Sequence, residues 1–570
     1  MRKPSKICRT LAAPLFFLSL TFITTGIQAQ LNGQAKSYSK QDTLRGTINE
    51  DRGWWDVKHY AVSVTPDYNS RKISGNVVMG FQVIKSGNRM QIDLQQPMEL
   101  TAATWNGQPL QITRDGNVAY LQFPNTPAIG SAQEVMLEYA GGPKVAKNPP
   151  WDGGWIFVKD KAGNPWMSVA CQGLGASVWF PCKDHQSDEP DSATLSITVP
   201  DTLTAVGNGR LREKKLAGEG KITWTWAVTN PINSYNIIPY IGKYVNWIEN
   251  YAGEKGNLDC SYWVLDYNLE KAKTQFQQAP LMLKCFEYWF GPYPFYEDGF
   301  KLVESPHLGM EHQSAVAYGN GYQNGYRGRD LSGSGYGLKW DFIIIHESGH
   351  EWFGNNITSN DIADMWLHEG FTNYSETIYT QCQSGKEAGL AYVSGTRALI
   401  QNKSPIIGPY GVNEEGSGDM YYKGGNLIHY FRQFFKDDEA FRQALREMSS
   451  TWYHTTANTA DIEKYWSKKA GRDLSKLFDQ YLRHILIPKL EYSVKGKTLS
   501  YRWTDCIPGY DVPVKISING GESQWIYPGT ASKDLKLKSN IQSVKVDPNF
   551  YVREEQVPAV NSKVKNSSLN

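Results

Sequence analysis

Alternating apolar and polar residues dominate the first part of the chain. Runs such as Tyr60–Val64, Gly75–Ile84, Met90–Leu94 and Glu134–Tyr139 have the two-residue period of β-strands. Turn sequences separate them, among them Trp105-Asn-Gly-Gln and Asp115-Gly-Asn. The pattern predicts an all-β domain over residues 49–247.

The period changes after residue 247. Leu269–Phe290 has helical spacing and ends at Gly291-Pro-Tyr-Pro, and helical patterns continue to residue 487. Strand patterns return after Pro488, at Leu490–Val494, Leu499–Trp503, Val512–Ser517 and Val544–Val546. We therefore expect a multidomain α+β protein with a mainly helical domain at 248–487, a small β domain at 488–552 and a disordered polar tail at 553–570.

The first residues have the composition of an export signal. A basic head, which includes Arg2 and Lys3, precedes the apolar run Leu11–Ile23, and a small residue, Ala29, ends a plausible cleavage site. The apolar run is too short for a membrane span. We predict a signal peptide at 1–29, a polar leader at 30–48 and a periplasmic or secreted protein.

The overall charge and the cysteines narrow the possible functions. A formal net charge of +2 gives no reason to expect a nucleic-acid partner, and no further apolar segment suggests a membrane span. After cleavage six cysteines remain of the seven in the chain. An exported protein can pair them, but their spacing does not fix which ones pair.

A metal-binding motif stands in the helical region. His346 and His350 are four residues apart, so one face of a helix presents both imidazoles to one ion. Glu369 follows and can supply a third ligand from a second helix, which leaves a fourth position of Zn²⁺ open for water. Glu347, next to the first ligand, is placed to take a proton from that water. A purely structural zinc site would be closed by a fourth protein ligand, so we predict one catalytic zinc per chain.

These motifs resemble the aminopeptidase N family of zinc exopeptidases. The similarity covers His346-Glu-Ser-Gly-His-Glu-Trp-Phe-Gly-Asn, Trp366-Leu-His-Glu-Gly-Phe-Thr, Trp179-Phe-Pro-Cys-Lys-Asp and Asp473-Leu-Ser-Lys-Leu-Phe-Asp-Gln-Tyr-Leu, in the family's order. The resemblance implies a saddle-like N-terminal β domain and a thermolysin-like catalytic domain.

The resemblance also implies three substrate contacts. Leu308-Gly309-Met310-Glu311-His312 is similar to the family's Gly-x-Met-Glu-Asn motif, which makes Glu311 the partner of the substrate's α-ammonium and Gly309 and Met310 part of the binding strand. Leu308 and His312 depart from that motif and put the backbone geometry there in doubt. In Tyr421-Tyr-Lys-Gly the first tyrosine matches the residue that stabilises the oxyanion, and Ala170-Cys-Gln172 matches a segment that contributes Gln172 to the amine pocket.

The function implied is the removal of N-terminal amino acids from peptides with a free N-terminus. A thermolysin-like endopeptidase shares the zinc site but needs no amine anchor, so Glu311 and Gln172 distinguish the two. A non-catalytic zinc-binding, receptor-like protein is the alternative from another class, and it has no need of Glu347 or Tyr421. The sequence leaves open the preferred N-terminal residue and the oligomeric state, for which a monomer is favoured.

Overall fold

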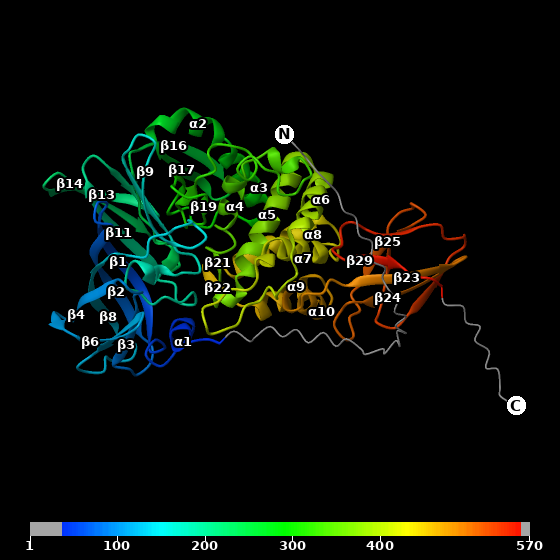
Figure 1. Cartoon of the computed structure of the whole chain (residues 1–570), viewed down its shortest axis with the longest axis horizontal. Coiled ribbons are helices and arrows are strands. Elements are labelled where there is room, and N and C mark those ends of the chain that lie inside the picture. Colours follow the sequence, from blue (N-terminus) through cyan, green and yellow to red (C-terminus); the bar gives the residue numbers. More distant parts are fainter. Residues whose placement is uncertain (1–36, 560–570) are drawn as a thin grey trace, which may run out of the picture. The chain divides into compact units, whose positions relative to one another are not determined.

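The computed structural model describes residues 37–559, so the predicted signal peptide and the residues from 560 onward lie outside it. The described part begins with helix α1 (Lys40–Gly46) and ends with strand β29 (Arg553–Gln556) (Figure 1). Helix α1 falls within the predicted leader, which is therefore partly structured. Ser39 caps its N-terminus in a capping box with Asp42, a local pattern that needs no apolar period.

The N-terminal domain consists of sheets, as predicted. The largest has eight strands in the order β13-β14-β11-β1-β2-β8-β4-β5, namely Arg210–Gly218, Lys221–Val228, Ser192–Pro200, Trp55–Asp67, Lys72–Val83, Ala132–Gly141, Glu99–Trp105 and Gln108–Pro109. Two smaller sheets are β12-β15-β10-β9 (Thr204–Val206, Tyr240–Gly242, Pro165–Ala170, Gly154–Lys159) and β3-β7-β6 (Arg89–Asp93, Val118–Gln122, Gln111–Asp115).

The two-residue period determines which side chains of strand β1 enter the core. Tyr60, Val62 and Val64 are buried, while Ala61 and Ser63 between them are half-buried. The strand pairs antiparallel with β2 and parallel with β11. The predicted turn after Trp105 is also present, because Asn106 and Gly107 both have positive φ angles, 51° and 74°, and close the β4–β5 hairpin.

A five-stranded sheet opens the second domain. Its order is β16-β17-β18-β20-β19, with bounds Tyr244–Gly253, Gly256–Leu265, Phe300–Glu304, Val316–Tyr318 and Gly309–Met310. The predicted domain boundary at residue 247 falls within β16. Periodicity could not place it, because β16 continues the strand pattern of the preceding domain while pairing with β17. Strand β18 is buried along its whole length, so it lacks the alternation that marks a half-exposed strand.

Helices make up most of the rest of this domain. In place of one predicted helix at Leu269–Phe290 there are two, α2 (Leu269–Gln275) and α3 (Gln278–Phe290). Those that follow are α4 (Phe342–Gly349), α5 (Trp366–Ser384), α6 (Lys386–Gly395), α7 (Tyr422–Arg432), α8 (Asp438–Thr451), α9 (Thr459–Lys469) and α10 (Ser475–Phe478). A short two-stranded sheet joins β21 (Ile357–Ser359) to β22 (Thr455–Ala457).

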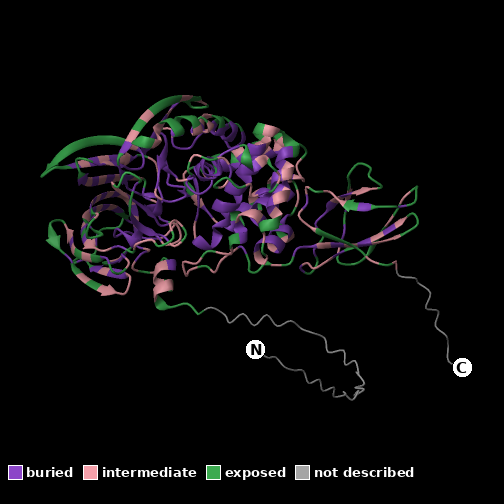
Figure 2. Cartoon of the chain, turned by 45° about the horizontal axis from the view of Figure 1, so that its top comes forward, coloured by how far each residue is buried: buried purple, intermediate pink, exposed green. Residues whose placement is uncertain are grey.

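Helices α4 and α5 are buried along nearly their whole length (Figure 2). Trp466 on α9 is fully buried and packs against rings from three other helices, Phe371, Phe431 and Phe441. Aromatic pairs of this kind add stabilisation beyond the area they bury. The cluster fixes α5 within the domain and, with it, Glu369.

The C-terminal region forms two small sheets. One has the order β27-β24-β23-β29 (Lys533–Lys536, Thr498–Thr504, Lys489–Lys495, Arg553–Gln556), and the other β26-β25-β28 (Gln524–Ile526, Val514–Ile518, Val544–Val546). The prediction of disorder from residue 553 was wrong for β29, which pairs in parallel with β23. This edge strand is exposed at every position, so backbone hydrogen bonds hold it and no apolar pattern marks it. The α+β architecture itself is confirmed.

None of the helices in residues 37–559 combines the length and the hydrophobicity that a membrane-spanning helix needs. The structure contains one disulfide in this range, between Cys285 of α3 and Cys382 of α5. It joins residues 97 positions apart in the sequence. The bond therefore links α3 to α5, the helix that carries Glu369.

We expect the double variant Cys285→Ala/Cys382→Ala to lower the free energy of unfolding of this domain by about 3–5 kcal/mol. Opening a loop of this length restores much of the conformational entropy of the unfolded chain. Urea unfolding followed by tryptophan fluorescence under oxidising conditions measures the change. Cys506→Ala, which removes a half-buried thiol outside the disulfide, serves as the matched control. Equal stability of the double variant and the parent would contradict the expectation.

Candidate active site

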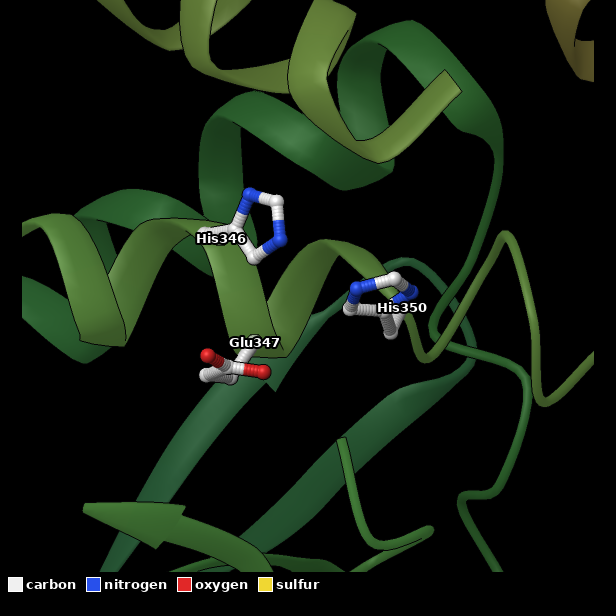
Figure 3. Close-up of side chains that lie close together, drawn as sticks. All are labelled: His346, Glu347 and His350. Atoms are coloured by element: carbon white, nitrogen blue, oxygen red, sulfur yellow. The ribbon is translucent and has the colours of Figure 1, made fainter. Parts of the chain in front are cut away.

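Helix α4 carries the first two predicted ligands at its C-terminal end. His346 lies in the last turn, and His350 is the C-terminal cap with helical backbone angles, so both imidazoles project from successive turns (Figure 3). Asp341 caps the other end and accepts hydrogen bonds from the backbone N–H groups of Ile343 and Ile344 at 3.1 and 3.4 Å. The ring of Phe342 stacks on His346, with centroids 5.1 Å apart. The helix therefore holds the two rings in fixed positions.

Glu369 on α5 supplies the third converging atom. Its Oε2 lies 3.5 Å from Nε2 of His346 and 3.4 Å from Nε2 of His350. This oxygen is buried and has no hydrogen-bond partner among the described residues. Two ligand atoms about 2.1 Å from a tetrahedral zinc ion lie about 3.4 Å apart. The three atoms thus fit Zn²⁺.

The other ring nitrogens are already engaged. Nδ1 of His346 contacts Oε1 of Glu376 at 2.7 Å, and Nδ1 of His350 contacts the carbonyl oxygen of Phe353 at 2.9 Å. The second oxygen of Glu376 accepts a hydrogen bond from the hydroxyl of Tyr392 at 2.7 Å. Partners of this kind fix the tautomer and the orientation of a metal-binding histidine. Each Nε2 is left for the metal.

The electrostatics of the site favour a cation. Burial lowers the pKa of His346, but Glu369 and Glu376 outweigh this effect and hold the pKa well above its ordinary value. Burial raises the pKa of Glu369, but His350 and His346 outweigh it and hold that pKa well below the usual range. The two buried imidazoles and the carboxylates of Glu369 and Glu376 therefore stabilise positive charge, which a divalent ion supplies.

The carboxylate of Glu347 also lies beside His346 and His350, but we expect it to act as a base and not as a metal ligand. This carboxylate and the two histidines lie within 4.8 Å of one another. Glu369 nevertheless remains the better third ligand, because its oxygen has short distances to both Nε2 atoms and no other partner. Burial raises the pKa of Glu347 to about 7, although His346 and His350 oppose the rise. A pKa near neutrality suits a general base.

Gly309 of β19 faces Glu347. A Cβ atom at this position would lie 2.6 Å from Oε1 of Glu347 and 2.9 Å from Cγ2 of Ile343. Both distances are too short for any real Cβ contact. The glycine of the binding strand is therefore required for Glu347 to keep its place.

Residues of both domains support the rest of the binding strand. The hydroxyl of Tyr235 donates to Oε1 of Glu311 at 3.1 Å, and Nδ2 of Asn355 donates to the backbone oxygen of Glu311 at 2.8 Å. His312 is fully buried and contacts the hydroxyl of Tyr240 through Nδ1. His312, which departs from the family motif, is therefore held by a specific contact, and the backbone around Glu311 is fixed.

Gln172 and Tyr421 complete the surroundings of the ligands. Nε2 of Gln172 donates to Oε1 of Glu369 at 3.0 Å, which ties the N-terminal domain to a predicted metal ligand. The ring of Tyr421 stacks on His346, with centroids 5.9 Å apart. Burial, reinforced by Glu369 and Glu415, raises the pKa of Tyr421 well above its ordinary value. The phenol keeps its proton and can donate a hydrogen bond.

All the predicted site residues line one cleft of about 850 Å³, namely Gln172, Gly309, Met310, Glu311, His346, Glu347, His350, Glu369 and Tyr421. Their individual roles stay predictions. The sequence analysis missed Glu376, Tyr235 and Glu415. Glu376 follows Glu369 by two helical turns, so its position on the same face of α5 could have indicated it. Nothing in the sequence marks the other two.

Comparison with known proteins identifies the family. Residues 56–236 match the model of the peptidase M1 N-terminal domain, and residues 282–481 match that of the peptidase family M1 domain. The chain belongs to peptidase family M1. This confirms the family expected from the motifs, and zinc is the cofactor that this ligand set and this family indicate.

Several relatives share most of the two matched regions. Human aminopeptidase B is 25% identical over 419 residues, which cover 67% of this chain and 60% of the relative. Probable aminopeptidase 2 of Sulfurisphaera tokodaii is 20% identical over 402 residues, which cover 67% of this chain and 50% of the relative. The match thus spans between half and three fifths of these relatives.

A solved structure matches more completely. A mutant M1 zinc metallopeptidase from Deinococcus radiodurans, crystallised with a Tyr-Ser-Ala substrate, has a TM-score of 0.65 and 22% sequence identity to this chain. The similarity covers 76% of this chain and 95% of that structure. The family therefore shares this fold.

We expect Glu376→Gln to weaken zinc binding about 10- to 100-fold, because the variant loses the charged partner that orients His346. Competition with a chelator of known affinity measures the change. Tyr392→Phe removes only the hydroxyl that supports Glu376 and is the graded control, with a smaller expected effect. Unchanged zinc affinity in Glu376→Gln would show that His346 is oriented by packing alone.

We expect Gly309→Ala to lower the turnover number about 100-fold while zinc remains bound. The added methyl group displaces Glu347, and a shift of about 1 Å at a reacting group has a cost of this size. Metal analysis and steady-state kinetics on one purified sample separate the two effects. Loss of zinc together with activity would instead indicate a general disturbance of α4.

Proposed function

We propose that this protein is a zinc aminopeptidase that removes single amino acids from the N-terminus of peptides. The observation that carries the proposal is the position of Glu311, a buried carboxylate that lines the same cleft as His346, His350 and Glu369. A carboxylate fixed near the metal binds a charged α-ammonium and so selects a free chain end. The names of the relatives, aminopeptidases among them, support the same activity.

The residues of the cleft divide the work of hydrolysis. Zinc, when bound, polarises the scissile carbonyl group and lowers the pKa of a water molecule. Glu347 accepts the proton of the attacking water and returns it to the leaving amine. Tyr421 donates a hydrogen bond to the oxyanion that develops on the carbonyl oxygen. Glu311 and the side-chain oxygen of Gln172 hold the ammonium, which places the first peptide bond at the reacting groups.

We also propose that the protein is exported to the periplasm or secreted. The basic and apolar order of residues 1–29 supports export, although those residues lie outside the described range. The disulfide between Cys285 and Cys382 is a second support, because such bonds persist in oxidising compartments.

The proposed activity is tested with one peptide in two forms, with a free and with an acetylated N-terminus. We expect the free peptide to lose one residue at a time, the acetylated peptide to stay intact, and a chelator to abolish the reaction. Mass spectrometry of timed samples follows the products. Internal cleavage of the acetylated peptide would make the protein an endopeptidase and would remove Glu311 from its role.

Two conservative variants separate binding from catalysis. We expect Tyr421→Phe to lower the turnover number about 100- to 1,000-fold with little change in KM, because its hydrogen bond forms only as the oxyanion develops. Glu311→Gln, by contrast, loses a contact that the bound substrate already makes, so its KM rises. Steady-state kinetics with a leucyl-naphthylamide give both constants. An equal effect of both variants on KM alone would contradict the role of Tyr421.

A further inference from the structure

The cleft holds more negative charge than the proposed reaction uses. Four of its carboxylates, those of Glu311, Glu347, Glu369 and Glu376, serve the metal, the water or the ammonium. Three others also line it, those of Asp152, Glu414 and Glu415, and no lysine or arginine of the described residues does so. A charge that the reaction does not require is a candidate for substrate selection.

Asp152 already has local partners. Its two carboxylate oxygens accept hydrogen bonds from the backbone N–H groups of Lys147 and Asn148 at 2.7 and 2.9 Å, so it stabilises its own loop. Glu415 differs, because within residues 37–559 no hydrogen bond or ion pair reaches its side chain. The Glu415 side chain is exposed to solvent in the open cleft. The surrounding walls of the cleft, with the charges of Glu369 and Glu311, raise the pKa of Glu415. A cation beside this carboxylate would offset the repulsion from those two glutamates.

Glu415 lies in the wall of the cleft next to the amine pocket. Its Oε2 is 4.0 Å from the point where a side chain on Gly173 would begin, so the glycine after Gln172 leaves space in front of it. Asn413 donates from Nδ2 to the backbone oxygen of Gly173 at 3.2 Å and fastens the two segments together. The charge of Glu415 also acts on Tyr421. The carboxylate of Glu415 therefore lies between Gln172 and Tyr421, which flank the proposed position of the first substrate residue.

Among residues 37–559, no lysine or arginine lines this cleft. Arg45 lies behind the same loop, but its guanidinium donates to the backbone oxygens of Gly173 and Leu174 and forms an ion pair with Asp184 at 3.6 Å. In the proposed function the α-ammonium of a substrate already binds Glu311. The side chain of a first residue that is lysine or arginine would bring a second positive charge near Gln172, which makes these the matching residues.

We propose that Glu415 is a specificity-determining residue that binds the cationic side chain of an N-terminal lysine or arginine, so that the preferred substrates are peptides with a basic first residue. This inference rests on the proposed function and names the substrate class of the same cleft. A charge-assisted hydrogen bond in such a site discriminates about 10- to 100-fold against a neutral side chain of equal size.

Matched pairs of substrates test the inference. We expect the parent protein to hydrolyse arginyl-naphthylamide about 10- to 100-fold more efficiently than citrullinyl-naphthylamide, and lysyl- more efficiently than norleucyl-naphthylamide, in kcat/KM. Glu415→Gln is expected to bring both ratios close to one, through a loss on the arginyl and lysyl substrates that exceeds any change on leucyl-naphthylamide. A uniform loss on every substrate would make Glu415 a second ammonium anchor and overturn the proposal, as would a parent that does not distinguish arginine from citrulline.

A charge-matched control separates local recognition from the general field of the cleft. Asp152→Asn removes one negative charge from the same cleft and is expected to preserve the arginine-to-citrulline ratio. An equal collapse of that ratio in Asp152→Asn would overturn the assignment to Glu415. Thermal unfolding of both variants verifies that each is folded as the parent is.

Calorimetry of free L-arginine and L-citrulline distinguishes the failure of this inference from that of the proposed function. The measurement uses the zinc-loaded protein with Glu347→Gln, alone and combined with Glu415→Gln. Tighter binding of arginine that depends on Glu415, without hydrolysis of any peptide by the parent, would sustain the inference and refute the activity. Hydrolysis of free peptides without preference for arginine, in rate or in binding, would refute the inference and sustain the activity.

Discussion

The structure depends on the convergence of two imidazoles and a carboxylate on one buried point. His346, His350 and Glu369 are almost completely shielded from solvent, where an isolated charge is costly. Against the effect of burial, Glu369 and Glu376 hold the pKa of His346 above its ordinary value, and the two histidines hold that of Glu369 below its usual range, so each group stabilises the charge of the others. Because the ligands come from α4 and α5, the metal site exists only while these helices stay packed. The aromatic cluster around Trp466 and the disulfide between Cys285 and Cys382 both stabilise that packing.

The proposed selection of the chain end would depend on a second condition, the contact between the N-terminal domain and the zinc helices. Tyr235 holds the carboxylate of Glu311, and Gln172 reaches across to Glu369. Neither domain alone therefore forms the amine pocket. Under the proposed function, the zinc site would cleave the peptide bond, and Glu311, held by Tyr235 of the N-terminal domain, would determine which bond reaches it.

The parts of the site that the sequence predicts are those encoded locally. His346, Glu347 and His350 are fixed by helical spacing, and Glu369 by its distance from them along the chain. Gly309 and Glu311 follow from a short motif, although only the structure shows that Gly309 is required by its contact with Glu347. Tyr235 approaches the site from a segment far away in the sequence, and Glu415, although it precedes Tyr421 by only six residues, stands in a loop that no local pattern marks. The same limit applies to strand β29, whose polar residues are held in the sheet by backbone pairing.

The charge of the cleft is a local property, because the chain as a whole carries a formal net charge of only +2. Carboxylates gathered in a cleft with walls of low dielectric constant produce a stronger potential than the same groups spread over the surface. Such a field would attract the positive N-terminus of any peptide and repel acidic first residues. General attraction alone cannot separate arginine from leucine by much, since both carry the same ammonium. Discrimination of that kind needs a carboxylate within hydrogen-bonding reach of the side chain and without a partner of its own. Glu415, which lines the cleft and has no hydrogen bond or ion pair among the described residues, is the residue proposed for this role.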